Sequence, residues 1–154
     1  MIFNVLDIRR GTTVDGPGFR TSVYLAGCNH NCPGCHNPDS WNFDGGVEMT
    51  LDEILAIIEE EDFDVTLTGG DPLMQPEKVR LLTKAIKQRF NKNIWLYTGF
   101  TISQIRLSPE LRKGVEYVDS IVEGPFKIAL RNTDLQFRGS SNQRIIHLNH
   151  NPLI

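Results

Sequence analysis

The sequence has few cysteines, no long apolar run and no excess of positive charge. It holds only three cysteines among 154 residues, and its formal net charge is −3. Binding along a nucleic-acid backbone needs a cationic surface, so nucleic acid is not an expected partner. A transmembrane helix needs roughly 18 to 20 consecutive apolar residues, and no stretch approaches that length, so no membrane partner is expected.

The amino terminus also lacks the features of a secretory signal. The opening residues, MIFNVLDIRR, contain no basic segment followed by a long apolar stretch. We therefore expect the protein in the cytoplasm. The length fits one domain with one core, and residues 1–154 are predicted to form a single domain. Arg9, Arg10 and Arg20 are expected to be solvated.

Short β-like runs alternate with helical patterns along the chain. Strands are predicted at residues 1–9, 19–26, 64–68, 94–98, 118–123 and within 138–148. Helices are predicted at residues 51–61, from Pro76 to about Phe90, and as one or two short segments within 101–112. A closed barrel of eight βα units takes about 250 residues. The predicted fold is therefore α/β, an open partial (β/α) barrel.

Such sheets place their chemistry beyond the carboxyl ends of the strands. The loop at residues 27–41 and the turn Gly69-Gly70-Asp71-Pro72 both follow predicted strands. We therefore expect the loop and the turn to meet on one rim of the sheet.

The three cysteines lie within eight residues, spaced Cys28-x3-Cys32-x2-Cys35. An odd number of closely spaced cysteines is a poor framework for disulfide bonds. It indicates metal binding or a redox function. A complete [4Fe–4S] site takes four thiolates, so three would leave one iron open to a small molecule. Two alternatives remain from the spacing alone, namely a structural zinc site completed by His30 or His36, and free thiols.

The segment at residues 11–41, GTTVDGPGFRTSVYLAGCNHNCPGCHNPDSW, resembles the radical S-adenosylmethionine superfamily and, more narrowly, the activating enzymes of glycyl-radical enzymes. The resemblance implies that Cys28, Cys32 and Cys35 bind three irons and that S-adenosylmethionine chelates the fourth. One electron from the cluster would then yield methionine and a 5′-deoxyadenosyl radical. It also implies that the backbone of Gly34, Cys35 and His36 lies near the adenine.

Further motifs extend the resemblance. Gly69, Gly70 and Asp71 resemble the glycine-rich element that holds the methionine amino group, although Asp71 stands where the superfamily usually has Glu. An ordinary βα turn capped by Asp71 is the alternative. Thr98-Gly99 resembles an element of the small activases. Glu123 is assigned to the ribose hydroxyls by the resemblance, with a surface or capping role as the alternative.

Two details narrow the family. Gly34 replaces the aromatic residue that usually precedes the third cysteine, and Cys-Pro-Gly-Cys resembles the small activases of anaerobic (class III) ribonucleotide reductase. The segment RGSSNQR at residues 138–144 is typical of the same activases, or else a loop leading into a final strand. No catalytic side chain is expected beyond the cofactors.

The implied function is that of an anaerobic, iron–sulfur oxidoreductase. It would abstract hydrogen from a backbone glycine of the ribonucleoside-triphosphate reductase, its protein substrate, with a flavodoxin-type protein as electron donor. One alternative is an activase of another glycyl-radical enzyme, such as pyruvate formate-lyase. The other is a non-catalytic zinc-binding module.

Overall fold

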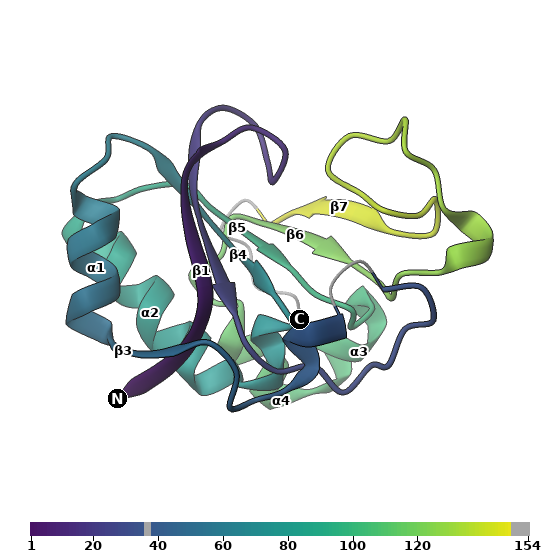
Figure 1. Cartoon of the computed structure of the whole chain (residues 1–154), viewed down its shortest axis with the longest axis horizontal. Helices are drawn as coiled ribbons and strands as arrows, with labels where there is room; N and C mark the ends of the chain where they lie inside the picture. The colour runs from purple at the N-terminus through teal and green to yellow at the C-terminus, as the bar shows by residue number, and fades with distance from the viewer. Residues whose placement is uncertain (36–37, 149–154) are drawn as a thin grey trace.

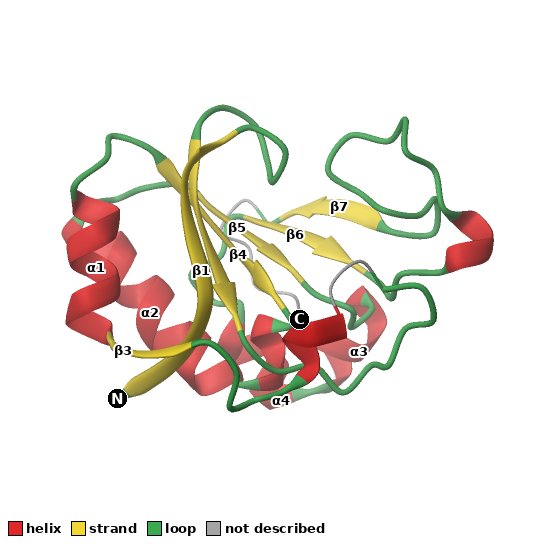
Figure 2. Ribbon diagram, viewed as in Figure 1, coloured by secondary structure: helices red, strands yellow, loops and turns green. Residues whose placement is uncertain are grey.

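The computed structural model describes residues 1–35 and 38–148 and contains one seven-stranded sheet in the order β3-β1-β2-β4-β5-β6-β7. The strands are β1 (Ile2–Thr12), β2 (Arg20–Leu25), β3 (Val47–Thr50), β4 (Asp64–Gly69), β5 (Ile94–Tyr97), β6 (Ser120–Glu123) and β7 (Arg144–His147). The α-helices are α1 (Leu51–Glu59), α2 (Pro76–Arg89), α3 (Ile102–Leu107) and α4 (Pro109–Gly114), and they lie along one side of the sheet (Figures 1 and 2).

None of the helices within the described part of the chain is both long and apolar enough to span a membrane.

The four central strands, β2, β4, β5 and β6, are parallel to one another. The predicted α/β class with an open, partial barrel is therefore confirmed. The outer strands differ from a pure βα repeat, because β1, β3 and β7 pair antiparallel with their neighbours. The connection from β1 to β2 is a short loop, and a short loop can join only antiparallel neighbours. The four-residue edge strand β3 was not predicted.

The helices begin where the sequence patterns predict. Thr50 caps α1, since its hydroxyl accepts a hydrogen bond from Glu53 N at 3.1 Å while Glu53 Oε1 accepts from Thr50 N at 3.0 Å. Pro76 occupies the first position of α2, where a missing N–H costs nothing. Ser108 ends α3 and caps α4, which explains the predicted restart of the helix.

The core lies between the helices and one face of the sheet. Alternate strand residues are fully buried there, including Val23, Val65, Leu67, Ile94 and Leu96. Because side chains alternate along a strand, the intervening residues point to the other face. That open face carries loops at residues 13–19 and 131–143 instead of helices (Figure 1). The sheet therefore has a packed side and a side whose shape is set by loops.

Arg20 fixes the first of these loops, contrary to the expectation that it is solvated. Only 1% of its surface is exposed. Its guanidinium donates to Pro17 O at 3.0 Å, Thr66 Oγ1 at 2.8 Å and Val65 O at 2.9 Å, and to both oxygens of Asn93. Burial lowers the pKa of Arg20. Sequence alone could not reveal this, because the acceptors are backbone carbonyls and neutral side chains from distant segments.

Candidate functional site

The cysteine loop and the Gly-Gly-Asp-Pro turn meet at one rim, as predicted. They follow β2 and β4, which are adjacent and parallel, with Leu25 paired to Gly69. Gly70 N donates to Leu25 O and Asp71 N donates to Gly27 O, each at 2.8 Å. A Cβ on Gly70 would lie 2.5 Å from Gly27 O. The close contact of the two segments therefore requires glycine at position 70.

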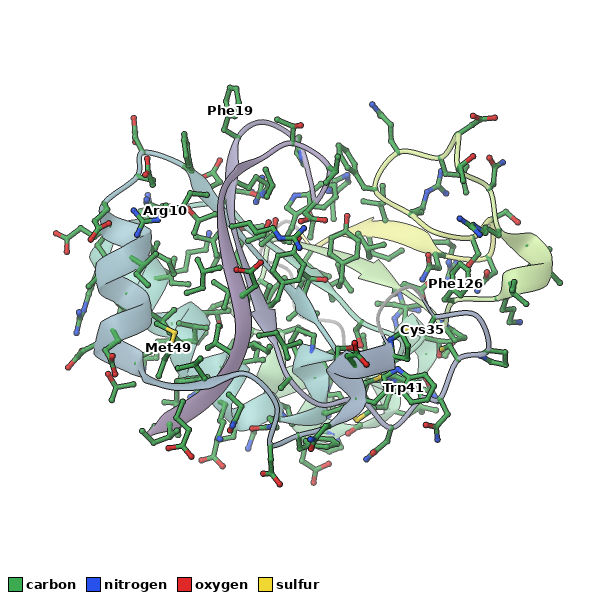
Figure 3. All side chains as sticks on the ribbon, viewed as in Figure 1. Arg10, Phe19, Cys35, Trp41, Met49 and Phe126 are labelled. Atoms are coloured by element: carbon green, nitrogen blue, oxygen red, sulfur yellow. The ribbon has the colours of Figure 1, made fainter. Side chains whose placement is uncertain are left out.

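The cysteine loop is closed at its base. Gly27 N donates to Ser40 O at 2.7 Å and Cys28 N donates to Trp41 O at 3.2 Å, which joins the start of the loop to its end. Figure 3 places Cys35 and Trp41 on this loop, whereas Phe19 projects at the opposite end of β2. The loop is therefore an anchored structure beyond the carboxyl end of β2.

Each of the three cysteines follows a residue with positive φ. Gly27 has φ 110°, Asn31 has φ 52° and Gly34 has φ 74°. Glycine adopts this region freely, and asparagine does so more readily than most other residues. The backbone thus bends immediately before each cysteine. In an extended chain successive side chains point to opposite faces, and these bends free the three thiols from that alternation. A Gly or Asn directly before each cysteine is visible in the sequence, and it is the signal from which these bends could have been predicted.

The three thiols are all partly exposed. Burial raises the pKa of the Cys28 thiol to about 11. A hydrogen bond from the His30 backbone lowers the pKa, but its effect is smaller than that of burial. Iron binds the thiolate, so ligation displaces the proton and is linked to pH. Three soft sulfur donors on one accessible loop fit an iron–sulfur cluster that keeps one iron without a protein ligand.

Within residues 1–35 and 38–148, no three His, Cys, Asp or Glu side chains are gathered as metal ligands, so the fit of the cysteines to a cluster rests on their donor type and shared loop and not on a preformed ligand geometry. His36, assigned by resemblance to the adenine site, lies outside the described residues.

Asp71 is the polar centre of the rim. Its side chain is only 1% exposed. Oδ2 lies 2.6 Å from His30 Nε2 and accepts hydrogen bonds from Thr98 Oγ1 at 2.9 Å and Gly99 N at 2.8 Å. Oδ1 accepts from Leu73 N at 2.9 Å. One carboxylate therefore joins the cysteine loop, the turn after β4 and the end of β5.

His30 was predicted only as a possible zinc ligand, and its contact with Asp71 was not predicted. It lies between Cys28 and Cys32, and its ring packs edge-on against Phe100 at 4.7 Å between centroids. A Cβ on Gly99 would come within 2.6 Å of the His30 ring, so a glycine is needed at the end of β5. The structure thus shows why Thr98-Gly99 belongs to the site: both residues hold Asp71.

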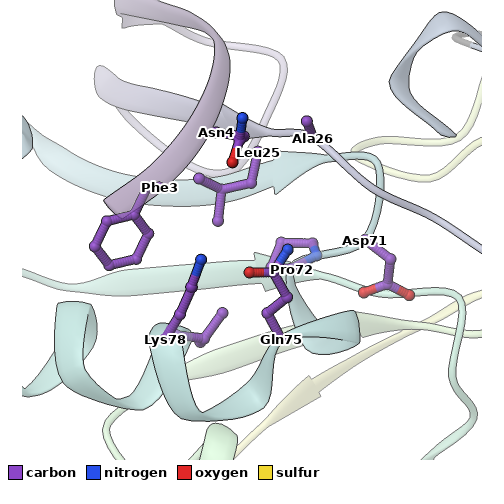
Figure 4. Close-up of a pocket in the computed structure, with 9 residues that line it drawn as sticks. Phe3, Asn4, Leu25, Ala26, Asp71, Pro72, Gln75 and Lys78 are labelled. Carbon is purple, nitrogen blue, oxygen red and sulfur yellow. The ribbon is translucent and has the colours of Figure 1, made fainter. Parts of the chain in front are cut away.

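The capping alternative for Asp71 is confirmed, because it caps the 3-10 helix η2 (Pro72–Met74). The assignment of Gly69, Gly70 and Asp71 to S-adenosylmethionine stays a prediction. A small hollow borders this turn, lined by Phe3, Asn4, Leu25, Ala26, Asp71, Pro72, Gln75, Lys78 and Val79 (Figure 4). Asp71 lies at the end of the hollow away from Phe3, and its carboxylate accepts hydrogen bonds from Thr98 and Gly99.

Glu123 has a structural role at the end of β6. It is 3% exposed, and its two oxygens accept from Ile102 N at 2.8 Å and from Arg144 Nε at 2.7 Å. The carboxylate therefore caps α3 and fixes β7, as in the alternative interpretation. Its assignment to the ribose hydroxyls stays a prediction.

The segment at residues 138–144 forms the predicted loop into a final strand. Gln143 Oε1 accepts from Gly139 N at 2.8 Å and Ser140 N at 3.2 Å, while Gln143 Nε2 donates to Gly124 O at 3.0 Å. The polar motif thus ties the last loop to the end of β6.

Gly34 provides a test of the loop geometry. A Cβ at this position would meet Ile128 Cδ1 at 2.5 Å, on the 3-10 helix η3 (Ile128–Leu130), in addition to the positive φ. We expect Gly34→Ala to destabilise the protein by about 1–2 kcal/mol and to lower the iron bound per chain. Urea unfolding and iron analysis measure both.

The double variant Gly34→Ala/Ile128→Ala separates the two causes, because removing the Ile128 side chain relieves the collision but not the backbone strain. Partial recovery of bound iron is expected. Wild-type stability and iron content in Gly34→Ala alone would show that the positive φ is not required.

An open, largely parallel sheet with three thiols on one rim loop is the framework of a protein that binds a metal or an iron–sulfur cluster. In agreement, the family model described as "4Fe-4S single cluster domain" matches residues 14–146.

Curated relatives identify the family. The chain is 36% identical over 139 residues to the anaerobic ribonucleoside-triphosphate reductase-activating protein of Enterobacteria phage T4, covering 86% of each chain. It is 31% identical over 144 residues to the Escherichia coli K12 protein of that name, covering 88% of this chain and 92% of the relative. It is 31% identical over 153 residues to the Haemophilus influenzae protein, covering 94% and 97%. The chain belongs to the family of anaerobic ribonucleoside-triphosphate reductase-activating proteins.

Proposed function

We propose that this protein activates an anaerobic ribonucleoside-triphosphate reductase by generating a radical on one of its backbone glycines. The observation that carries the proposal is the rim loop with three partly exposed thiols. The family membership supports the choice of partner, since the relatives are named for that reductase.

Cys28, Cys32 and Cys35 are the proposed cluster ligands. A [4Fe–4S] cluster held there would supply one electron for the cleavage of S-adenosylmethionine into methionine and a 5′-deoxyadenosyl radical, and that radical would take a hydrogen atom from the target glycine. The chain itself holds the ligand loop in place through Asp71 and His30, and it presents Gly69 and Gly70 at the same rim. We propose that the backbone of these glycines, with Asp71 and Glu123 nearby, completes the cosubstrate site.

The electron has to come from outside the chain. We propose a flavodoxin-type protein as the donor and the reducing cytoplasm as the compartment, where free thiols are maintained. We also propose that residues 1–154 act as a single domain, since one sheet carries every site residue described above.

The test is radical transfer in a defined mixture without oxygen. The reconstituted protein, a chemical reductant, S-adenosylmethionine and the reductase should give a glycyl radical signal in electron paramagnetic resonance. Leaving out S-adenosylmethionine, or replacing the target glycine of the reductase with alanine, should remove the signal. Pyruvate formate-lyase in place of the reductase should give none.

An intact cluster that cleaves S-adenosylmethionine but never produces a radical on the reductase would contradict the proposed partner. A radical on pyruvate formate-lyase alone would assign the protein to the other glycyl-radical enzyme.

A further inference from the structure

The 3-10 helix η3 carries two exposed apolar side chains beside the cysteine loop. Ile128 is 56% exposed and Leu130 is 42% exposed. The helix follows β6 and projects at the edge of the molecule (Figures 1 and 2). Because a Cβ on Gly34 would lie 2.5 Å from Ile128 Cδ1, the Ile128 side chain lies against the loop one residue before Cys35. An accessible apolar surface therefore adjoins a proposed cluster ligand.

The last loop fixes η3 in this exposed position. Lys127 N donates to Ser140 Oγ at 3.2 Å, and Ser141 N donates to Leu130 O at 2.9 Å. Ser140 is itself fully buried. Apolar side chains that the fold holds out toward solvent, next to one another, are typical of an interaction site.

Two cations flank the apolar side chains of η3. Lys127 and Arg131 are both exposed, and neither side chain forms an ion pair with another residue that the structure describes. Residues 124–143 contain three basic residues and one acidic residue, Asp134, whereas the whole chain has a net charge of −3. This part of the surface is therefore suited to attract an acidic protein.

We propose that an acidic, flavodoxin-type electron donor docks on the surface that η3 forms with the cysteine loop, namely Pro33, Gly34, Lys127, Ile128, Leu130 and Arg131. All six residues are exposed. This inference rests on the proposed function and gives its electron donor a docking surface. One electron passes from the donor to the cluster, so the donor is oxidised, the cluster is reduced and no bond forms or breaks.

The position of the η3 surface favours the electron donor over the reductase. The target glycine of the reductase has to reach the cosubstrate, whose proposed site includes the glycine turn after β4. The helix η3 follows β6, which is two strands away from β4 in the sheet. An electron needs only to reach the cysteine loop, which Ile128 already contacts. A few apolar side chains with flanking charges also suit the small interface of a transient redox complex.

The variant Lys127→Gln/Arg131→Gln tests the charged part of the η3 surface. The Kd of the reconstituted protein for an acidic flavodoxin should rise about three- to tenfold at low ionic strength. The difference from the wild type should shrink at high salt, because salt screens exposed charges. The matched control is Arg106→Gln/Lys113→Gln, which removes the same two charges from exposed positions on α3 and α4 and should bind as the wild type does.

The variant Leu130→Ser tests the apolar part. It should also raise the Kd about three- to tenfold, and this difference should remain at high salt because apolar contacts are not screened. At limiting flavodoxin, the cluster should be reduced more slowly by a similar factor in both the charge variant and Leu130→Ser. Dithionite should reduce the cluster as in the wild type, because a small reductant does not need a docking surface.

Binding and reduction by flavodoxin at the wild-type level in both variants would overturn the proposal, as would a wild-type protein that does not bind flavodoxin. If the variants give less glycyl radical than the wild type with dithionite as reductant, the surface belongs to the reductase and the proposal is wrong. A wild-type protein that forms no glycyl radical with dithionite would overturn the proposed function, whereas the flavodoxin Kd and the rate of cluster reduction would still decide the docking surface.

Discussion

Replacing Cys28, Cys32 or Cys35 singly with alanine is expected to abolish cluster assembly. Two thiolates cannot hold three irons, and the rim offers no spare cysteine, because the chain contains only three. Iron and sulfide per chain should fall to background in each variant. Cleavage of S-adenosylmethionine should fall by more than roughly 100-fold, beyond the range seen when groups outside the ligand set are removed.

The control for these variants is the iron-free protein. All three thiols are partly exposed and lie outside the hydrophobic core, so the iron-free variants should melt close to the iron-free wild type. Equal melting temperatures with unequal iron contents would attribute the defect to ligation. Full cosubstrate cleavage in any one variant would refute the assignment of that cysteine.

Replacing Asp71 with asparagine is expected to destabilise the rim. The carboxylate accepts hydrogen bonds from Leu73 N, Thr98 Oγ1 and Gly99 N and contacts His30 Nε2. An asparagine side chain offers one acceptor oxygen and brings two N–H donors of its own. Some of the buried donors that now bond to the carboxylate would therefore face an N–H group and lose their acceptor. We expect a loss of about 2–4 kcal/mol in the free energy of unfolding. The iron retained per chain should fall as well, because His30 loses its anchor.

The matched control is Asp52→Asn, in which the same change is made at a side chain that is 83% exposed and pairs only loosely with Arg89. Such a surface substitution should change stability by less than about 0.5 kcal/mol and leave bound iron unchanged. Urea unfolding of the iron-free proteins, followed by iron analysis after reconstitution, gives both quantities. If Asp71→Asn retains wild-type stability and iron, the hydrogen-bond network around Asp71 does not hold the loop.

The fold could be predicted where the determinants are local. The capping pair Thr50 and Glu53, the proline that begins α2 and the restart at Ser108 are each contained in a few residues, and each marks a helix as predicted. The meeting of the loop at residues 27–41 with the Gly-Gly-Asp-Pro turn also followed from sequence, since adjacent parallel strands end at the same edge of a sheet.

The contacts that organise the site could not be predicted from sequence patterns. His30 and Asp71 are 41 positions apart, and nothing near either residue specifies the other. The contacts of Glu123 with Ile102 N and Arg144 Nε likewise join distant segments that no local pattern connects. Edge strand β3 has exposed and partly exposed residues without alternation, so its pairing with β1 left no periodic signal.

The anchoring of the cysteine loop by Asp71 sets an order of events during synthesis of the chain. All three cysteines are among the first 35 residues synthesised, but Asp71 and its partners Thr98 and Gly99 follow later. Until Thr98 and Gly99 have emerged, the nascent loop has its thiols but lacks the hydrogen-bond network through Asp71 that holds it in the folded protein. The loop is therefore anchored only in a nearly finished chain, because a small domain folds as a unit.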